Sequence, residues 1–499
     1  MARILIIGGG VSGLSAGIYA QLSGHQAVIC EKNHIVGGNL TGWQRGEYHI
    51  DNCIHWLTGT NPNSSTYKLW EELGVLGGID IFQPDSLYTC EYKGERLSLY
   101  KDINRLEKEM LLKSATDKKE IISFISAIKA MQALCGIGGE AHNHKASRGE
   151  LFASLPLILK YHKLSTGELS QRFTSPLIQR FISCFIGNDF SSLALICVFA
   201  HFCGENGGIP KGSSLAMAMR MANRFKELGG EILTDKEAVR IFHEGNRAYS
   251  VTFKDGSSYF ADYIILTTDP KMTFEKLFDL PIPKSIDALY QNKRLFRFSS
   301  YHCAFACDTD KLPFTGDYSF EIPFKYRARL KASYLTIREF SHEKSFAPKD
   351  KSIIQAIVFC NEESSLEFIK LKENQEAYSE LKKELSAIIE KIIIGQLPQL
   401  NSKLECIDCW TPATYKKFVN SEIGSYMSFA FGPRYLPLRA SNRISGLNNV
   451  ILATQWQQVP GGLPIAASGG KLAIETVNKL EKQRKRKRTK NTDLVGINN

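Results

Sequence analysis

The chain opens with a short apolar run, a glycine-rich turn, a helical stretch and a second apolar run. Residues 4–7 are wholly apolar, which is typical of a strand buried on both faces in a parallel sheet. A helix is predicted over residues 12–23, and residues 27–30 form the next apolar run. This strand–turn–helix–strand order predicts a βαβ unit.

The turn of this unit carries glycines at the G-x-G-x-x-G spacing. The first glycine permits a tight turn, the second lets backbone approach a pyrophosphate, and the third lets the helix pack closely on the strand. Glu31 follows by about 20 residues, where a carboxylate can accept ribose hydroxyls. A glycine-rich turn without a ligand is the alternative, but the complete order of elements favours a dinucleotide. The predicted contact residues are Gly8, Gly10, Val11, Ser12, Gly13, Glu31 and Lys32.

A second glycine turn follows the acidic residue. Gly37 and Gly38, followed by Asn39, bring backbone close to the same ligand, which indicates a long cofactor lying across the sheet edge. The next segment contains His55. Because histidine titrates near neutral pH, His55 is our candidate general acid or base. The alternative is a histidine that supports its loop through hydrogen bonds.

The glycine signals cease between residues 81 and 204. Helices are predicted over residues 103–112 and 118–134, and the segments 151–165 and 190–203 are strongly apolar. Such helices are usually buried core. The functional alternative is the wall of a tunnel for an apolar substrate, with a mouth that rests on a membrane.

The dinucleotide-binding pattern resumes near residue 205. A long amphipathic helix ends at Gly229-Gly230, and residues 263–266 form another buried parallel strand. Residues 271–410 then form a second segment of the substrate-binding type. It contains predicted strands at 301–307 and 352–359 and a helix at 373–394.

Near the C-terminus a last apolar strand, residues 450–453, leads to a glycine–proline turn and a helix over residues 465–480. Gly469 and Gly470 inside that helix cost about 1 kcal/mol each relative to alanine, which indicates a neighbour packed very closely against them. The start of the helix places its positive dipole end where it can stabilise an electron-accepting ring. The residues of this turn are Gly461, Gly462, Leu463 and Pro464.

Composition adds limits on location. Of the 499 residues, 43% are hydrophobic and 23% charged, as in ordinary globular proteins. We expect no signal peptide, since the first strand begins at once, and no membrane span, so a cytoplasmic location is predicted.

The twelve cysteines are scattered. Cys406 and Cys409 form one C-x-x-C without a second pair, so we expect free thiols and no metal site.

The net charge of +11 is partly due to residues 482–490, which carry seven basic residues and no acid. We expect a solvated, disordered tail over residues 482–499. The functional alternative is peripheral attraction to an anionic membrane. Nucleic-acid binding is not expected, because no upstream segment resembles a module that recognises nucleic acids.

These motifs together resemble the phytoene desaturase branch of the flavin amine-oxidase-like superfamily, which includes carotenoid cis–trans isomerases and retinol saturases. The resemblance rests on Gly8–Gly13 with Glu31, on "VGGNLTGW", on "GIPKGSSLAMAM" with "ADYIILTTDP", and on "ILATQWQQVPGGLPIAASGG". It touches both ends and the middle of the chain. The spaced set is far more specific than the first motif alone.

The resemblance implies an α/β fold with tightly bound FAD. An FAD-binding Rossmann-like domain of the glutathione-reductase type would comprise residues 1–80, 205–270 and 411–481. An inserted α+β substrate domain would comprise residues 81–204 and 271–410. By resemblance, Glu31 holds the adenine-side ribose, Gly37, Gly38 and Asn39 face the pyrophosphate or flavin side, and Gly461–Pro464 lie under the isoalloxazine.

The implied activity is desaturation, saturation or cis–trans isomerisation of carbon–carbon bonds in a long apolar, carotenoid-like or other lipid substrate. Saturation needs an electron donor such as NAD(P)H. Lys211-Gly212 stands where relatives carry a glycine pair, and "DNCIHWLTG" replaces their Asp-x-Gly pattern, so substrate and direction stay open. A flavin amine oxidase and a non-catalytic flavin- or lipid-binding protein are the alternatives.

Overall fold

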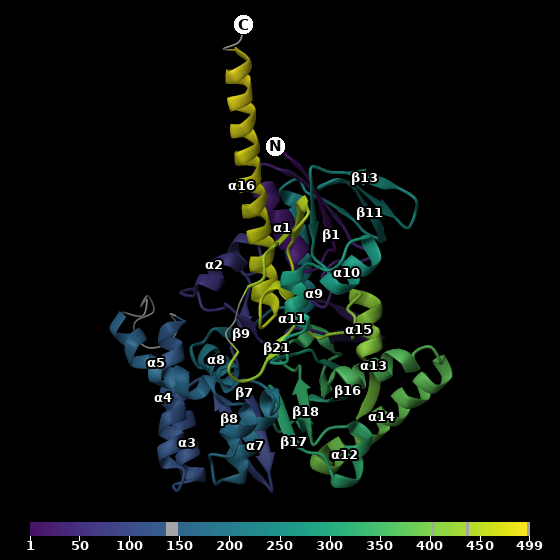
Figure 1. Ribbon diagram of the computed structural model, residues 1–499. Helices are drawn as coiled ribbons and strands as arrows, with labels where there is room; N and C mark the ends of the chain where they lie inside the picture. The colour runs from purple at the N-terminus through teal and green to yellow at the C-terminus, as the bar shows by residue number, and fades with distance from the viewer. Residues whose placement is uncertain (136–147, 402–403, 436–438, 497–499) are drawn as a thin grey trace.

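Two β-sheets, each covered by helices, organise the chain (Figure 1). The computed structural model describes residues 1–135, 148–401, 404–435 and 439–496. One sheet has six strands and the other has seven. The cavity described below lies between the parts of the molecule that these sheets organise.

The six-stranded sheet has the order β10-β2-β1-β14-β23-β22, and all neighbours are parallel except β22, which is antiparallel to β23. Its strands come from residues within 1–80, 205–270 and 411–481. They are β1 (Arg3–Ile7), β2 (Gln26–Cys30), β10 (Glu231–Leu233), β14 (Tyr263–Leu266), β22 (Arg443–Ile444) and β23 (Leu447–Leu452).

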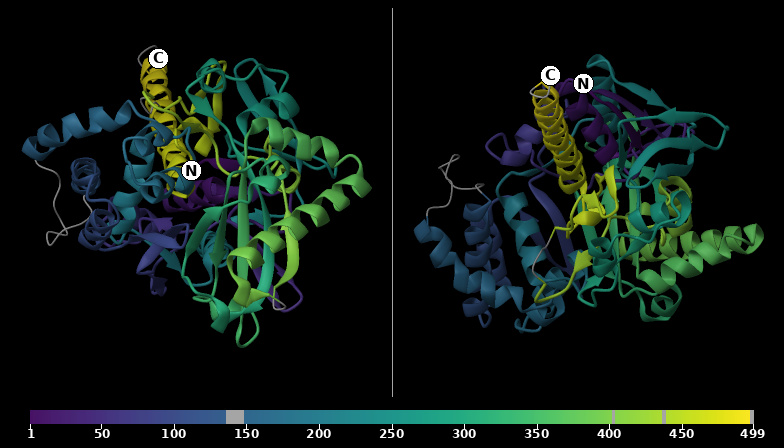
Figure 2. Two further views of the ribbon diagram at one scale, coloured as in Figure 1. Left: turned by 90° about the horizontal axis from the view of Figure 1, so that it is seen from below. Right: turned by 45° about the horizontal axis from the view of Figure 1, so that its top comes forward.

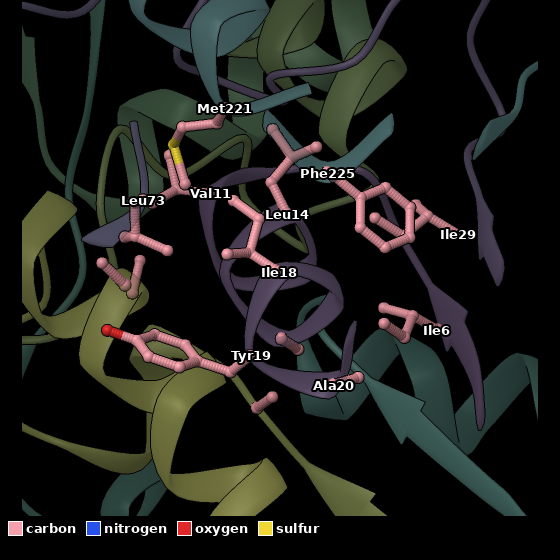
Figure 3. Packing of buried hydrophobic residues seen from close by; sticks show 14 of the residues in the cluster. Ile6, Val11, Leu14, Ile18, Tyr19, Ala20, Ile29, Leu73, Met221 and Phe225 are labelled. Atoms are coloured by element: carbon pink, nitrogen blue, oxygen red, sulfur yellow. The ribbon is translucent and has the colours of Figure 1, made fainter. Parts of the chain in front are cut away.

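Successive side chains of β1 point to opposite faces of this sheet, as the period of two in a strand requires. Ile4 and Ile6 face α1 (Val11–Leu22), α9 (Ser213–Glu227) and α16 (Leu463–Gly496). Figure 3 shows side chains of α1 meeting those of α9 in this core. Leu5 and Ile7 face an antiparallel layer. Its strands are β11 (Ala238–Glu244), β12 (Arg247–Phe253) and β13 (Ser258–Phe260).

The seven-stranded sheet has the order β20-β16-β19-β18-β17-β7-β8, and only β7 and β17 pair in parallel. The long helix α14 (Gln375–Gln396) packs on one face of it, where Leu385 and Ile389 meet Phe305 and Ile354. The strands are β7 (Ser86–Tyr92), β8 (Glu95–Tyr100), β16 (Ser299–Asp308), β17 (Asp317–Glu321), β18 (Tyr334–Glu339), β19 (Lys351–Cys360) and β20 (Glu405–Trp410).

A block of helices stands beside this sheet, on the side opposite α14 in Figures 1 and 2. Its core joins helix side chains such as Phe124, Phe181 and Phe199 to strand side chains such as Leu97 and Leu99. The helices are α3 (Ile103–Lys113), α4 (Lys118–Leu134), α5 (Arg148–His162), α6 (Thr166–Ser170), α7 (Pro176–Ile186) and α8 (Ser192–Cys203).

Helix α16 corrects two expectations about the C-terminus. We expected a helix over 465–480 and a disordered tail over 482–499, but α16 continues through Gly496 and projects from the body in Figure 1. Lysine and arginine are good helix formers, and no proline interrupts the segment. Arg484 also approaches Asp262 at 4.0 Å and Glu481 at 3.5 Å. Residues 497–499 lie outside the described residues.

The remaining elements are short and connect or flank the strands and helices described above. None of the helices that the structure describes is long and apolar enough to cross a membrane. The connecting elements are α2 (Ser65–Glu72), α10 (Pro270–Leu277), α11 (Lys284–Tyr290), α12 (Phe324–Leu330), α13 (Glu362–Leu371), α15 (Pro412–Val419), β3 (Gly42–Arg45), β4 (Tyr48–Asp51), β5 (Leu57–Thr58), β6 (Ile81–Phe82), β9 (Gly207–Pro210), β15 (Leu295–Phe296) and β21 (Ala430–Phe431).

Candidate functional site

A single continuous cavity of about 1150 Å³ begins at the carboxyl ends of β1 and β14 and reaches the helical block. Ligands of open α/β sheets bind at such carboxyl ends. The volume exceeds the roughly 300–1,000 Å³ of an ordinary small-molecule pocket. The cavity is therefore large enough for an extended cofactor.

The structure brings the sequence-predicted site residues together around this cavity, with one exception. Gly13 does not line it and instead lies against the backbone of Gly8. The residues that do line it are Gly8, Gly10, Val11, Ser12, Glu31, Lys32, Gly37, Gly38, Asn39, His55, Gly461, Gly462, Leu463 and Pro464.

The first glycine turn positions the start of α1 beside the second turn. Gly8 has a φ of +103°, a backbone conformation that side-chain-bearing residues rarely adopt, and its N–H donates to Cys30 O at 2.9 Å. Gly10 caps α1 and forms a parallel bridge with Gly37. The N-terminal N–H groups of α1 therefore border the cavity, as an anion-binding helix start requires.

The carboxylate of Glu31 is buried and holds this turn together. One oxygen accepts from Gly9 N at 2.7 Å, and the other accepts from Asn33 N at 2.9 Å and Asn33 Nδ2 at 2.8 Å. Burial raises the pKa of Glu31, although these hydrogen bonds oppose the shift. Each carboxylate oxygen has two acceptor positions, so capacity for a ribose hydroxyl remains. Burial also lowers the pKa of the neighbouring Lys32.

At the other end of the cavity, the turn before α16 presents bare backbone. Gly462 has a φ of +124°, and its N–H donates to Gln455 Oε1 at 2.9 Å. A Cβ at Gly462 would meet nothing closer than Met427 Cε at 3.9 Å. The first turn of α16 opens here, so its positive dipole end lies at the cavity.

These features fit the expected FAD. At Gly10, an added Cβ would have Gly37 O as its nearest neighbour, at 3.8 Å, so the backbone there also opens onto the cavity. Bare backbone at both ends lets a pyrophosphate approach one helix start and a flat ring system approach the other. The carboxylate of Glu31, the predicted ribose ligand, directly follows β2 and accepts from Gly9 N in the first turn.

His55 lies half-buried at the cavity wall, and its Nε2 is 2.7 Å from the hydroxyl of Tyr426. Burial holds the pKa of His55 well below its ordinary value of 6.5, and the positive charge of Arg338 and the neighbouring His302 act in the same direction. The imidazole is therefore neutral at physiological pH, because its surroundings disfavour the protonated form. Its role as general acid or base stays a prediction.

Sequence reasoning missed Arg338 and Asp317, which also line the cavity. Arg338 Nε contacts Asp317 Oδ1 at 2.5 Å, and Nη2 binds the other carboxylate oxygen. Nη1 has no hydrogen-bond partner among the described residues, although Arg338 is only 4% exposed. The alternation of residues in β18 could have indicated Arg338. Leu335 and Ile337 face the core under α14, so Arg338 belongs to the opposite face of the strand.

His302 lies behind this wall and gives the site a measurable pH dependence. It stacks on Trp410 with centroids 4.7 Å apart, and its Nε2 contacts Ser300 Oγ at 2.7 Å. Burial, reinforced by the charge of Arg338, lowers the pKa of His302 from 6.5 to about 3. Below about pH 6.5, His302 binds a proton in the unfolded chain but not in the folded chain. The free energy of unfolding therefore decreases as the pH falls below this value.

We therefore expect the His302→Gln variant to lose stability less steeply than the parent chain between about pH 6.5 and pH 5. The slope of unfolding free energy should be shallower by up to about 1.4 kcal/mol per pH unit. Denaturant titrations at a series of pH values measure it. Parallel slopes in the two proteins would show that His302 titrates normally in the folded chain.

Comparisons with known proteins agree with this geometry. Residues 11–292 match the family model described as flavin containing amine oxidoreductase. The chain is 24% identical to the prolycopene isomerase of Daucus carota over 453 residues, covering 85% of this chain and 71% of that protein. It is 20% identical to the 4,4'-diaponeurosporene oxygenase of Staphylococcus aureus over 508 residues, covering 96% and 98%.

Solved structures confirm the expected fold class. An oxidoreductase from Methanosarcina mazei has a TM-score of 0.61 at 14% identity and covers 95% of this chain and 100% of its own. Cyclohexylamine oxidase from Brevibacterium oxydans has a TM-score of 0.60 at 14% identity, covering 96% and 99%. Since the family model spans more than half of the sequence, the chain belongs to the family of flavin-containing amine oxidoreductases.

Proposed function

We propose that the chain is an FAD-dependent oxidoreductase that acts on carbon–carbon bonds of a long apolar molecule of the carotenoid or a related lipid class. The observation that carries the proposal is an apolar wall continuous with the cofactor end of the cavity. This wall consists of Leu155, Ile158, Phe185, Ile186, Leu193 and Val198. A long apolar molecule gains by leaving water along such a wall.

The relatives support this substrate class. Besides the prolycopene isomerase, a phytoene desaturase (lycopene-forming) of Paracoccus is 21% identical over 286 residues, covering 55% of this chain. We propose the same class of substrate for this chain. Whether the reaction is desaturation, saturation or isomerisation depends on the electron partner, for which NAD(P)H is the candidate donor.

The chain's own residues supply binding, orientation and a dry site. FAD when bound supplies hydride or electron transfer, and the protein excludes water from the reacting carbons. The neutral His55 is placed to accept or return a proton at Nε2, through its contact with Tyr426. The free Nη1 of Arg338 can donate to an oxygen of the cofactor or of the substrate.

The charges around Asp317 disfavour an amine at that part of the cavity, whereas the side chains of Phe298, Phe359 and Tyr426 offer an aromatic face elsewhere along it. An ammonium group needs a free carboxylate or an aromatic face. Asp317 is already held by two nitrogens of Arg338, and the guanidinium would repel a second cation. The amine oxidase alternative therefore serves as the control arm of the experiment.

The experiment begins with the flavin content of the purified full-length chain, which we expect to approach one FAD per chain. Bleaching of the oxidised flavin under anaerobic conditions is then recorded with carotenoids, retinoids, simple amines and NAD(P)H in separate arms. Bleaching by an apolar polyene, or NAD(P)H-driven reduction followed by reoxidation with such a polyene, is the expected result. Bleaching by amines alone would overturn the substrate class, and absence of flavin after reconstitution would overturn the enzyme.

Replacing His55 by alanine tests its proton transfer. We expect flavin content to be retained and turnover of the active polyene to fall about 10²- to 10⁴-fold, the usual contribution of a positioned acid or base. Tyr426→Phe is the matched variant, because it removes only the hydroxyl that contacts His55. Unchanged turnover of His55→Ala with full flavin content would leave His55 as a structural residue.

We also propose peripheral contact of the basic end of the chain with anionic membranes. Residues 482–490 carry seven basic residues, each worth about 1 kcal/mol near an anionic surface. Sedimentation with phosphatidylserine vesicles should retain the full chain, and removal of residues 482–499 should abolish this. Equal binding to neutral vesicles would contradict the proposal.

A further inference from the structure

Two cysteines and a histidine gather on the cavity wall where α4 ends against α8. Cys135 caps the C-terminus of α4, and Cys197 and His201 lie one turn apart on α8. One side-chain atom from each, two sulfurs and a ring nitrogen, lie within 4.8 Å of one another. Cys197 and His201 also line the cavity, and all three residues are half-buried. The cluster therefore borders the space in which a ligand would lie.

The hydrogen bonds of Asn206 determine which ring nitrogen of His201 carries the proton. The side-chain nitrogen of Asn206 lies 3.0 Å from His201 Nδ1, and its oxygen accepts from Asn61 N at 3.0 Å. Turning the amide over would place two donors against each other at Asn61. Because an amide nitrogen can only donate, Nδ1 is the acceptor. Neutral His201 consequently carries its proton on Nε2.

This arrangement favours a thiolate over a bound metal ion. A metal would need an unprotonated ring nitrogen, but Nδ1 is taken by Asn206 and Nε2 holds the proton. Hydrogen bonds from Cys197 and His201 lower the pKa of the Cys135 thiol, against the effect of burial. The hydrogen bond to Cys135 and burial raise the pKa of Cys197. The pair thus combines one thiolate with one protonated thiol.

We propose that Cys135 is a peroxide-reactive thiolate that forms a reversible disulfide with Cys197. The Cys135 sulfur attacks a peroxide oxygen, so that an S–O bond forms, the O–O bond breaks and hydroxide leaves. The Cys197 thiol then attacks the sulfenic sulfur. The S–S bond forms, the S–O bond breaks, and the second hydroxide leaves with the Cys197 proton as water. The first hydroxide takes up the proton that the Cys135 thiol released when it ionised, so two thiols and one hydrogen peroxide give one disulfide and two waters in total.

The disulfide would tie the end of α4 to the cavity-facing side of α8. Both sulfurs must move from within 4.8 Å to bonding distance, about 2.05 Å, which a change of rotamer at the end of a helix can supply. The link would alter the wall that Cys197 and His201 contribute to the cavity. This inference does not depend on which substrate the enzyme uses.

The first test needs no variant. The full chain is alkylated briefly with iodoacetamide at slightly acidic pH, and each cysteine peptide is quantified by mass spectrometry. Cys406 is the control, because its side chain is exposed while its pKa is raised to about 11. We expect Cys135 to react at least about 10-fold faster than Cys406, since only thiolates react. Slower reaction of Cys135 would overturn the proposal.

The second test follows oxidation by hydrogen peroxide. Peptide mapping without reductant should recover the Cys135–Cys197 disulfide, and Cys184→Ser, a change elsewhere in the helical block, should leave it intact. In Cys197→Ser a sulfenic acid should instead be trapped on Cys135. Absence of both products would refute the reaction. Stoichiometric zinc whose removal is required for alkylation would show a metal site in its place.

Discussion

Replacing Gly470 by alanine should destabilise the fold by about 2–3 kcal/mol, while the same change at the adjacent Gly469 should be neutral or stabilising. A Cβ at Gly470 would lie 2.5 Å from Ser12 O and 2.6 Å from Ala16 N, both backbone atoms of α1. Backbone cannot give way as a flexible side chain can, so α1 and α16 would have to separate. Ser15 Oγ also donates to Ala467 O at 2.6 Å across this contact, a bond that separation would break.

At Gly469 the nearest atom to an added Cβ is Thr454 N at 3.6 Å, an ordinary contact. Alanine then gains up to about 1 kcal/mol of helix propensity over glycine. Differential scanning calorimetry should show a melting temperature several degrees lower for Gly470→Ala and an unchanged or higher one for Gly469→Ala. Equal shifts in the two variants would mean that the two helices are not in backbone contact.

The second large effect separates cofactor binding from folding within one glycine motif. In Gly10→Ala the new Cβ meets Gly37 O at 3.8 Å, and the φ of −73° at this position suits alanine. We expect the fold to be kept, at a cost of about 1 kcal/mol for the helix cap, where alanine is less favourable than glycine. The Cβ projects where a pyrophosphate must approach backbone N–H groups, so FAD affinity should fall roughly 10- to 100-fold.

Gly13→Ala is the contrasting variant. Its Cβ would lie 1.9 Å from Gly8 O, so α1 could not pack on β1, and the chain should unfold or aggregate. Fluorescence titration of the apoprotein with FAD, together with a circular dichroism spectrum, distinguishes the two outcomes. Full FAD affinity in Gly10→Ala would place the pyrophosphate away from this turn.

The local motifs were predictable because their partners are close in sequence. The strand, glycine turn, helix and acid of residues 4–31 form one βαβ unit, so spacing alone fixes which atoms meet. Gly9 N and the carboxylate of Glu31, 22 residues apart, do meet at 2.7 Å. The close neighbour predicted for the glycine pair in the last helix is real as well, but which of the two glycines contacts α1 was visible only in the structure.

The apolar helices show a limit of pattern reasoning. Helix α8 is apolar nearly all round, so its sequence favours burial without showing what each side meets. In the structure Leu193, Cys197 and His201, spaced by four residues, line the cavity, while Leu195 and Phe199 enter the core of the helical block. Both interpretations of this segment, core and cavity wall, therefore hold for different faces of one helix.

The sequence by itself determined the βαβ unit, the glycine turns and the family to which the chain belongs, because these rest on short-range order that only a few backbone conformations satisfy. The tertiary structure alone decided the contacts of Arg338 with Asp317, of His55 with Tyr426, and of the Cys135 cluster. The His55 and Tyr426 side chains are 371 residues apart in the chain yet 2.7 Å apart in space. Such pairs are set by how the sheets and helices pack on one another, and no periodicity along the chain records that packing.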